Sequence, residues 1–125
     1  MAIINPSVSR DVSSPGNIVL VTWVLPAAGD VGAPFKLDRW GTSSFNVFGT
    51  TITALALQGC NDADTPSGAS WNALRDWGGG SLAAVAAAGL YSPRDFPIWI
   101  RPVLTTGAAV TVQLALRRQD AGQVG

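Results

Sequence analysis

The sequence contains no histidine and no glutamate, and it has a single cysteine, Cys60. It therefore lacks the usual general base at neutral pH and the commonest zinc ligand. All eight acidic residues are aspartates, and no two of them stand out as a catalytic pair. Cys60 has no histidine to activate it and no second cysteine with which to form a disulfide. We therefore expect a protein that is not an enzyme and that needs no metal or cofactor.

Charged residues are also scarce, at 13% of the 125 residues, whereas 47% are hydrophobic. An average soluble domain has about 25% charged residues, so much of this surface must be apolar or weakly polar. Exposed apolar patches usually mark interfaces, which predicts an oligomer or a component of an assembly. The net charge is zero and Arg117-Arg118 is the only basic cluster, which argues against nucleic-acid binding.

Long apolar runs are missing as well. None approaches the roughly 20 residues of a membrane span, and the start, MAIINPSVSR, lacks the basic and apolar regions of a secretion signal. We expect no membrane association, and a product that stays in the cytosol until it is assembled or released.

The residues that are present predict strands. Apolar and β-branched stretches bounded by turn residues favour strands, and they occupy residues 17–25, 44–49, 50–58, 96–105 and 109–118. In the first stretch the side chains that would point to either face of the strand are apolar, which is typical of a strand covered on both faces. Gly49 separates the second from the third. The last stretch alternates cleanly, with Val110, Val112, Leu114 and Leu116 on one face.

Segments rich in glycine, proline and aspartate predict turns at residues 26–34, 62–68, 77–80 and 105–108. Pro102 has no N–H to donate, so we expect it at a sheet edge or a bulge. Residues 81–91 favour a strand with a following turn, a helix being the alternative. Short strands and frequent turns predict an all-β fold: a single antiparallel β-sandwich, jelly-roll-like, over residues 18–119. An extended arm, 1–17, precedes it and a tail, 120–125, follows.

Two features favour contacts with another subunit. The arm is extended by its prolines and carries apolar residues suited to a neighbour's sheet edge, disorder being the alternative; these are Ile3, Ile4, Val8 and Val12. Trp99 points to the opposite sheet face from Ile98 and Ile100, so one side of that strand is expected to meet another subunit.

An acidic turn followed by tryptophan, QGCNDADTPSGASW, is the candidate partner or ligand loop. Asn61, Asp62 and Asp64 resemble calcium ligands, but the downstream bidentate acid of a calcium loop is missing. Side-chain turns that close a hairpin are favoured instead. Trp71 and Trp77 are candidates for a sugar-stacking platform, although burial in a core or an interface is favoured for such rings.

Three segments resemble, in order, a family of small head proteins of tailed bacteriophages. They are VTWVLPAAGDVGAPFKL (21–37), FNVFGTTITALALQGCNDADTPSGASWNALRD (45–76) and AAAGLYSPRDFPIWIRPVLTTGAAVTVQLALRRQ (86–119). That family has V-x-W…GD-x-GAP, then an (E/Q)GSNDG-x-NW-x-L-x-D hairpin, then an RP-x-(V/L)-T-x-G…A-R-R ending. The sequence departs from it at Cys60, where serine is usual, and in the longer turn before Trp71.

The resemblance implies a capsid decoration, or cement, protein on the surface of the virion head. Its partners would be the major capsid protein and further copies of itself, often in a trimer, and it would be made in the host cytoplasm. A tail or neck position is the alternative within the virion.

The same hairpin resembles that of discoidin-like, galactose-binding β-sandwiches. This second resemblance implies a carbohydrate-binding or host-attachment module, with Asn61, Trp71 and Trp77 as the binding residues.

Overall fold

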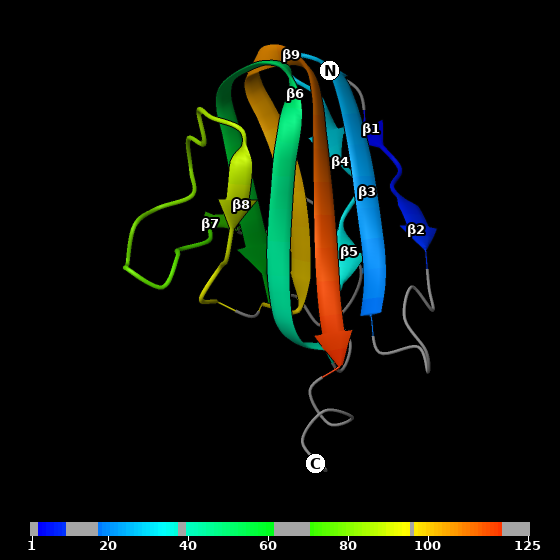
Figure 1. Cartoon of the computed structure of the whole chain (residues 1–125), viewed down its shortest axis with the longest axis vertical. Helices are drawn as coiled ribbons and strands as arrows, with labels where there is room; N and C mark the ends of the chain where they lie inside the picture. The colour runs from blue at the N-terminus through cyan, green and yellow to red at the C-terminus, as the bar shows by residue number, and fades with distance from the viewer. Residues whose placement is uncertain (1–2, 10–17, 38–39, 62–70, 96, 119–125) are drawn as a thin grey trace.

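The computed structural model describes residues 3–9, 18–37, 40–61, 71–95 and 97–118 (Figure 1). Within these ranges the secondary structure is strand and turn, with no helix, and so none that could span a membrane. The strands are β1 (Ile3–Ile4), β2 (Ser7–Ser9), β3 (Ile18–Ala27), β4 (Val31–Gly32), β5 (Phe35–Lys36), β6 (Trp40–Cys60), β7 (Asn72–Ala73), β8 (Gly89–Tyr91) and β9 (Trp99–Arg118). The predicted all-β fold is confirmed.

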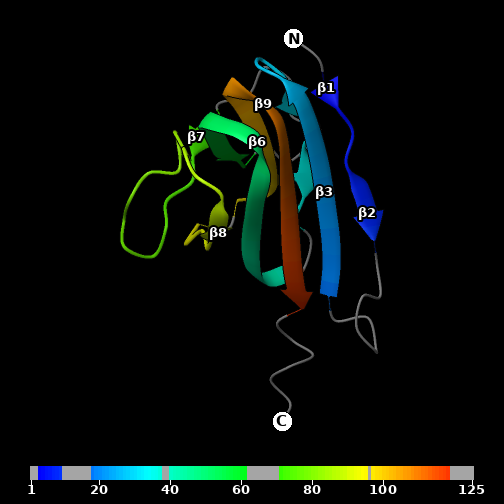
Figure 2. The ribbon, with the colours of Figure 1, turned by 45° about the horizontal axis from the view of Figure 1, so that its top comes forward.

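One curled sheet forms both layers of the sandwich (Figures 1 and 2). The long strands β6 and β9 pair antiparallel from Trp40↔Arg118 to Cys60↔Trp99. The first half of β6 and the second half of β9 form the first layer with β2, β3 and β8. The other halves form the second layer with β1, β4, β5 and β7. The architecture is therefore an antiparallel, jelly-roll-like sandwich, with one short parallel pair between β1 and β4.

The two long strands pass from one layer to the other at a glycine-containing corner. Gly49 lies opposite Val110, and Gly107 lies opposite Ile52 beside a register shift. Gly107 has a φ of +141°, and a Cβ there would lie 2.5 Å from the Thr51 carbonyl oxygen. Only glycine fits this close approach. The sequence predicted separate strands on the two sides of Gly49, and again on the two sides of residues 105–108. In the structure each pair is one strand that bends, β6 and β9 respectively.

The core lies between the layers and follows the predicted alternation. Val110, Val112, Leu114 and Leu116 are fully buried, which confirms the predicted inward face of β9. They pack in one cluster with residues of both layers, among them Trp23, Phe45, Leu55, Leu57, Ile100 and Leu104. Burial of such side chains contributes roughly 1.5–3 kcal/mol each.

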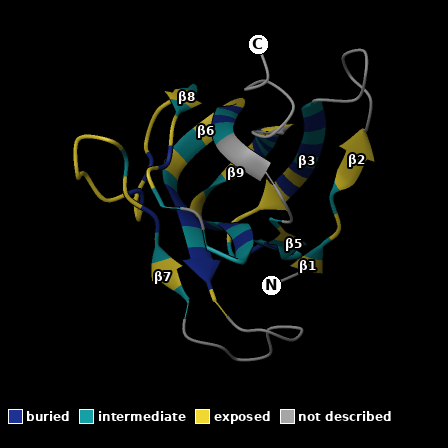
Figure 3. Cartoon of the chain, turned by 90° about the horizontal axis from the view of Figure 1, so that it is seen from below, coloured by how far each residue is buried: buried dark blue, intermediate teal, exposed yellow. Residues whose placement is uncertain are grey.

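Along β3, by contrast, burial alternates, as Figure 3 shows. The prediction that this stretch is covered on both faces is therefore wrong for the single chain. Leu20 is half-buried and Val24 is exposed on the outward side. An apolar strand with one open face is the pattern expected where a second protein surface covers it.

The arm is extended, as predicted, and residues 3–9 pair with the chain's own sheets. β1 joins β4 in the second layer, and β2 joins β3 in the first. Ile4 also packs against the core. Both pairings lie on the same side of the sandwich (Figure 2), so residues 3–9 complete two sheet edges of one chain.

Segment 81–88 is neither the predicted strand nor the alternative helix. It crosses the second layer through single bridges, Leu55 to Val85 and Arg75 to Ser81, before β8 begins at Gly89. Leu82 and Val85 are buried there, whereas the alanines between and after them are exposed. Two anchoring side chains therefore hold an irregular segment whose backbone forms only isolated bridges.

The V-x-W…GD-x-GAP motif joins β3, β4 and β9. The Trp23 indole Nε1 donates to the Ala33 carbonyl at 2.9 Å. A Cβ on Gly32 would lie 2.5 Å from Pro102 Cδ and 2.7 Å from Trp23 Cδ1. Gly32 therefore allows the tryptophan, the β4 backbone and Pro102 to pack together.

The buried Asp30 fixes the adjoining turn. Its carboxylate accepts from the Ala27 N–H at 2.8 Å, and its carbonyl accepts from the Leu104 N–H at 2.9 Å.

Pro102 lies within the second layer, between β6 and the β4–β5 side, and not at an outer edge of the sheet. The predicted irregularity is present beside it, because the register shifts by one residue between Val31↔Val103 and Phe35↔Ile100. Leu104 directs its N–H to Asp30, on the β4 side. Backbone direction alternates along a strand, and Pro102, two residues earlier, therefore faces the same side. On that side the chain is not in a strand between the end of β4 and the start of β5. The sheet therefore requires no backbone N–H donor from residue 102.

The corner yields the first testable prediction. Gly107→Ala should lower the free energy of unfolding by about 1–3 kcal/mol, because the backbone conformation is strained for any residue with a Cβ. Chemical denaturation measures this change. Gly78→Ala is the matched control, since its Cβ would come no closer than 3.4 Å to another group. Equal stability of wild type and Gly107→Ala would contradict the account of the corner.

Candidate functional site

The predicted hairpin around the acidic turn is present. β7 pairs with the end of β6 through Gln58↔Ala73 and Gly59↔Asn72. Asn61 follows β6, and Trp71 precedes β7. Asp62 and Asp64 lie outside the described residues. Asn61 and Trp71 therefore mark the two ends of the candidate loop on the second layer.

Asn61 ties this hairpin to the start of β9. Its side-chain oxygen accepts a hydrogen bond from the Ile98 N–H at 3.0 Å. The partner is 37 residues away, so the bond is a tertiary contact and not the local turn that the sequence predicted. It accounts for an asparagine at this position without any ligand.

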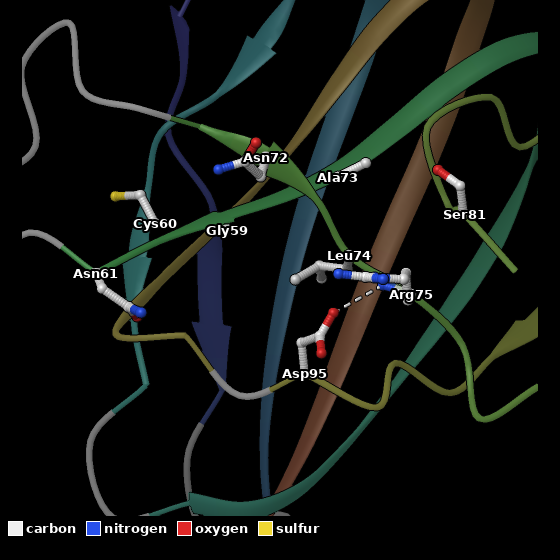
Figure 4. Close-up of a pocket in the computed structure, with 9 residues that line it drawn as sticks. All are labelled: Gly59, Cys60, Asn61, Asn72, Ala73, Leu74, Arg75, Ser81 and Asp95. Atoms are coloured by element: carbon white, nitrogen blue, oxygen red, sulfur yellow. Dashed lines mark hydrogen bonds between the residues drawn. The ribbon is translucent and has the colours of Figure 1, made fainter. Parts of the chain in front are cut away.

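An open hollow of about 740 Å³ lies beside the hairpin (Figure 4). Its lining is mostly polar and comes from the ends of β6 and β7 and from two neighbouring segments: Gly59, Cys60, Asn61, Asn72, Ala73, Leu74, Arg75, Ser81 and Asp95. The Asp95 carboxylate accepts from the Arg75 backbone N–H at 3.0 Å. In Figure 4 the Cys60 side chain points away from Asp95, so the two do not form a nucleophile and base.

A cluster of three side chains occupies the outer face of the second layer, next to the hairpin. The Arg101 guanidinium lies 4.1 Å from the centre of the Trp71 ring. Its Nε donates to the side-chain oxygen of Gln58 at 2.9 Å, and the two residues are cross-strand neighbours. Burial lowers the pKa of Arg101 from its ordinary value, and the nearby Cys60 opposes this shift. We call Gln58, Trp71 and Arg101 the Arg101 cluster.

Trp99 lies in the adjacent cross-strand row. It pairs with Lys36 on one side and with Cys60 on the other. The Lys36 ammonium lies 5.9 Å from the centre of its ring. Ile100 is fully buried, whereas Trp99 is half-buried, which confirms that the two point to opposite faces. Whether Trp99 meets another subunit stays a prediction.

Trp77 stands apart from this cluster at the tip of a tight turn. Its side chain is 68% exposed. The carboxylate of Asp76 accepts from the N–H groups of Gly78 and Gly80, at 2.9 and 2.8 Å. Burial in the core, which the sequence favoured for such rings, is wrong for Trp77 in the single chain. The turn holds the ring outward, where a partner can cover it.

The arm residues are placed differently from one another. Ile3 is 70% exposed and Val8 is also exposed, whereas Ile4 packs against the core. Val12 lies outside the described residues. Ile3 and Val8 are therefore the predicted apolar arm residues that remain accessible to a partner.

The outer face of the first layer is a feature that the sequence did not single out. Its side chains lie in cross-strand rows and carry no charge: Ser7, Ser9, Leu20, Thr22, Val24, Ser44, Asn46, Phe48, Leu90, Thr111, Gln113 and Ala115. We call these residues the uncharged face. Arg117, in the next row along β9, is a charged residue just beyond this face.

Three apolar side chains on the uncharged face are exposed. The exposed fractions are 55% for Val24, 43% for Phe48 and 73% for Leu90. In Figure 1 the strands of this face are nearest the viewer, and no other described element crosses in front of β3 or β9. The face is open in the single chain.

Metal-binding chemistry finds little support in the described part of the chain. It contains no group of three or more cysteine or aspartate side chains close enough to hold an ion. The arrangement offers surfaces for contact, stacking and hydrogen bonding.

Comparisons with known proteins add little about function. No family model and no curated protein matches the sequence. Among solved structures, a cupin domain from Bordetella pertussis Tohama I is similar, with a TM-score of 0.43 and 13% sequence identity over 91% of each chain.

The Asn61 contact distinguishes a structural asparagine from a calcium ligand. Asn61→Ala should lower the free energy of unfolding by about 1 kcal/mol, because the Ile98 N–H loses its acceptor. The control Asn72→Ala removes an exposed amide of the same hollow and should change stability less. Addition of EDTA should leave the melting temperature of the wild type unchanged. A large drop with chelator in the wild type, and no such drop in the Asn61→Ala variant, would instead indicate a metal loop.

Proposed function

We propose that this chain is a capsid decoration protein of a tailed bacteriophage, a non-enzymatic component that binds the outside of the head and stabilises it. The observation that supports the proposal is the uncharged face, because exposed apolar side chains on a face without charge are typical of a surface that binds another protein. The three motifs that resemble, in order, those of small phage head proteins indicate that the assembly would be a phage head. The major capsid protein and further copies of the chain, in a trimer, are the proposed partners.

The composition of the uncharged face suits an interface. The buried centre of a protein interface is depleted in charged residues and enriched in aromatic ones. The face offers Phe48 with Val24 in the same cross-strand row, and polar side chains such as Asn46 and Gln113 beside them. These polar groups can hydrogen-bond across an interface and keep the free chain in solution.

The decoration role also explains how such a protein would act. A protein that binds the assembled shell more tightly than its separated parts stabilises the shell by mass action. This effect requires contact surfaces and no chemistry. The exposed Ile3 and Val8 of the arm add a second contact in the proposal, next to the sheet edges that residues 3–9 complete.

A carbohydrate-binding module is the second candidate, and the exposed ring of Trp77 favours it. Trp71 is less suited to stacking on a sugar, because Arg101 covers one face of its ring. The side-chain oxygen of Asn61 is engaged by Ile98. Of the three proposed sugar-binding residues, Trp77 alone presents an uncovered platform in the described structure.

Binding to phage heads tests the proposal. Purified wild-type chains should attach to heads in a fixed, saturable number and raise the temperature at which heads burst. Val24→Asp combined with Phe48→Asp should weaken attachment about 30-fold or more, since a charge buried without a partner costs about 2–5 kcal/mol. The control Ala84→Asp adds a charge at an exposed site of the second layer and should attach normally. Glycan binding that is lost in Trp77→Ala, without attachment to heads, would favour the second candidate.

The arm has its own test. Ile3→Asp should leave the circular dichroism spectrum and the melting temperature nearly unchanged, because the side chain is 70% exposed. It should lower the affinity for heads if the arm lies in the contact. Ala84→Asp again controls for the added charge. Unchanged attachment of Ile3→Asp would show that this part of the arm only completes the chain's own sheet.

A further inference from the structure

Among the residues that the structure describes, Arg101 is a charged side chain without an acidic partner. It is half-buried on the outer face of the second layer, and burial of a charge is costly unless the charge is paired. In the described part of the chain the single ion pair joins Arg94 to Asp95, at 3.9 Å. The hydrogen bond to Gln58 engages the Nε of Arg101 and brings no negative charge.

The guanidinium is held in a fixed orientation. Trp71 covers one face of the group, and Gln58 fixes its Nε edge. A side chain held at two points loses less conformational entropy when it binds a ligand. The two terminal nitrogens can then donate parallel hydrogen bonds to a carboxylate, which is the geometry that arginine favours.

The surroundings add to the positive potential. Lys36 projects from the neighbouring row, over the ring of Trp99. Two cations and two tryptophan rings therefore lie on one sheet face. Tryptophan and arginine are the residues that most often dominate binding at protein interfaces.

We propose that the Arg101 cluster is a binding site for a carboxylate, the aspartate or glutamate side chain of a partner protein. If the chain decorates phage heads, this carboxylate belongs to the capsid surface; the identification of that partner rests on the proposed function, whereas the carboxylate site does not. The uncharged face and the Arg101 cluster then lie on opposite layers and make separate contacts.

Titration with sodium acetate tests the site without any partner. The backbone, indole and guanidinium N–H resonances are followed by NMR, with sodium chloride at equal ionic strength as the reference. We expect saturable shifts of the Arg101 Nε–H and Trp71 indole signals. Arg101→Gln should abolish them, and Arg101→Lys should weaken binding about tenfold, because lysine keeps the charge and loses the planar pair of donors. Arg117→Gln, on the opposite layer, is the matched control and should leave them unchanged.

Other outcomes overturn the proposal. Equal shifts with chloride, or with acetate in the Arg101→Gln variant, would mean that the cluster only stabilises the sheet. Tighter binding of phosphate than of acetate would contradict a carboxylate site.

Attachment to heads separates this inference from the proposed function. If wild type and Arg101→Gln both fail to attach while acetate still binds the wild type, the decoration role fails and the carboxylate site stands. If the wild type attaches and acetate does not bind, the site fails and the role stands.

Discussion

The continuous pairing of β6 with β9 is the constraint on which the rest of the structure depends. Because the same two strands supply the middle of both layers, the sandwich exists only if both strands bend together. The bend requires residues without a Cβ, or with an unusual backbone angle, at one place: Gly107 meets the Thr51 carbonyl, and the nearby Ala109 has a φ of +53°. The shorter strands then add to edges that this ribbon defines.

The sequence predicted the strands of the ribbon and missed its continuity. Alternation at 109–118 identifies the inward face correctly, because burial on one side imposes a period of two. Gly49 and residues 105–108 look like turns, since local chemistry does not distinguish a turn from a corner inside a long strand. The gap between β4 and β5 explains why the sheet tolerates Pro102. This gap lies beside Pro102 only in the folded chain, so the sequence around the proline does not reveal it. The Arg101 cluster was missed for the same reason, although one arginine within the apolar stretch IWIRPVL was a visible signal.

The motifs that resemble those of phage head proteins mostly build the fold. Trp23, Gly32 and Pro102 pack together, and Asp30 fixes the turn beside them. Because these residues pack the interior of the chain, we look to its surface for the contacts that would carry a function. Two surfaces differ in character: the uncharged face of the first layer, and the cationic, tryptophan-bearing face of the second. In the proposed role they allow one small domain to bridge two neighbours, which is how a cement protein would hold a shell together.

The most direct test of this account is cryo-electron microscopy of phage heads saturated with the purified chain. The account predicts ordered density at symmetry-related positions on the outer surface, with the β3–β9–β6 side of the first layer buried against another protein. Heads without added density, or bound chains whose Val24 and Phe48 side chains face solvent, would contradict it.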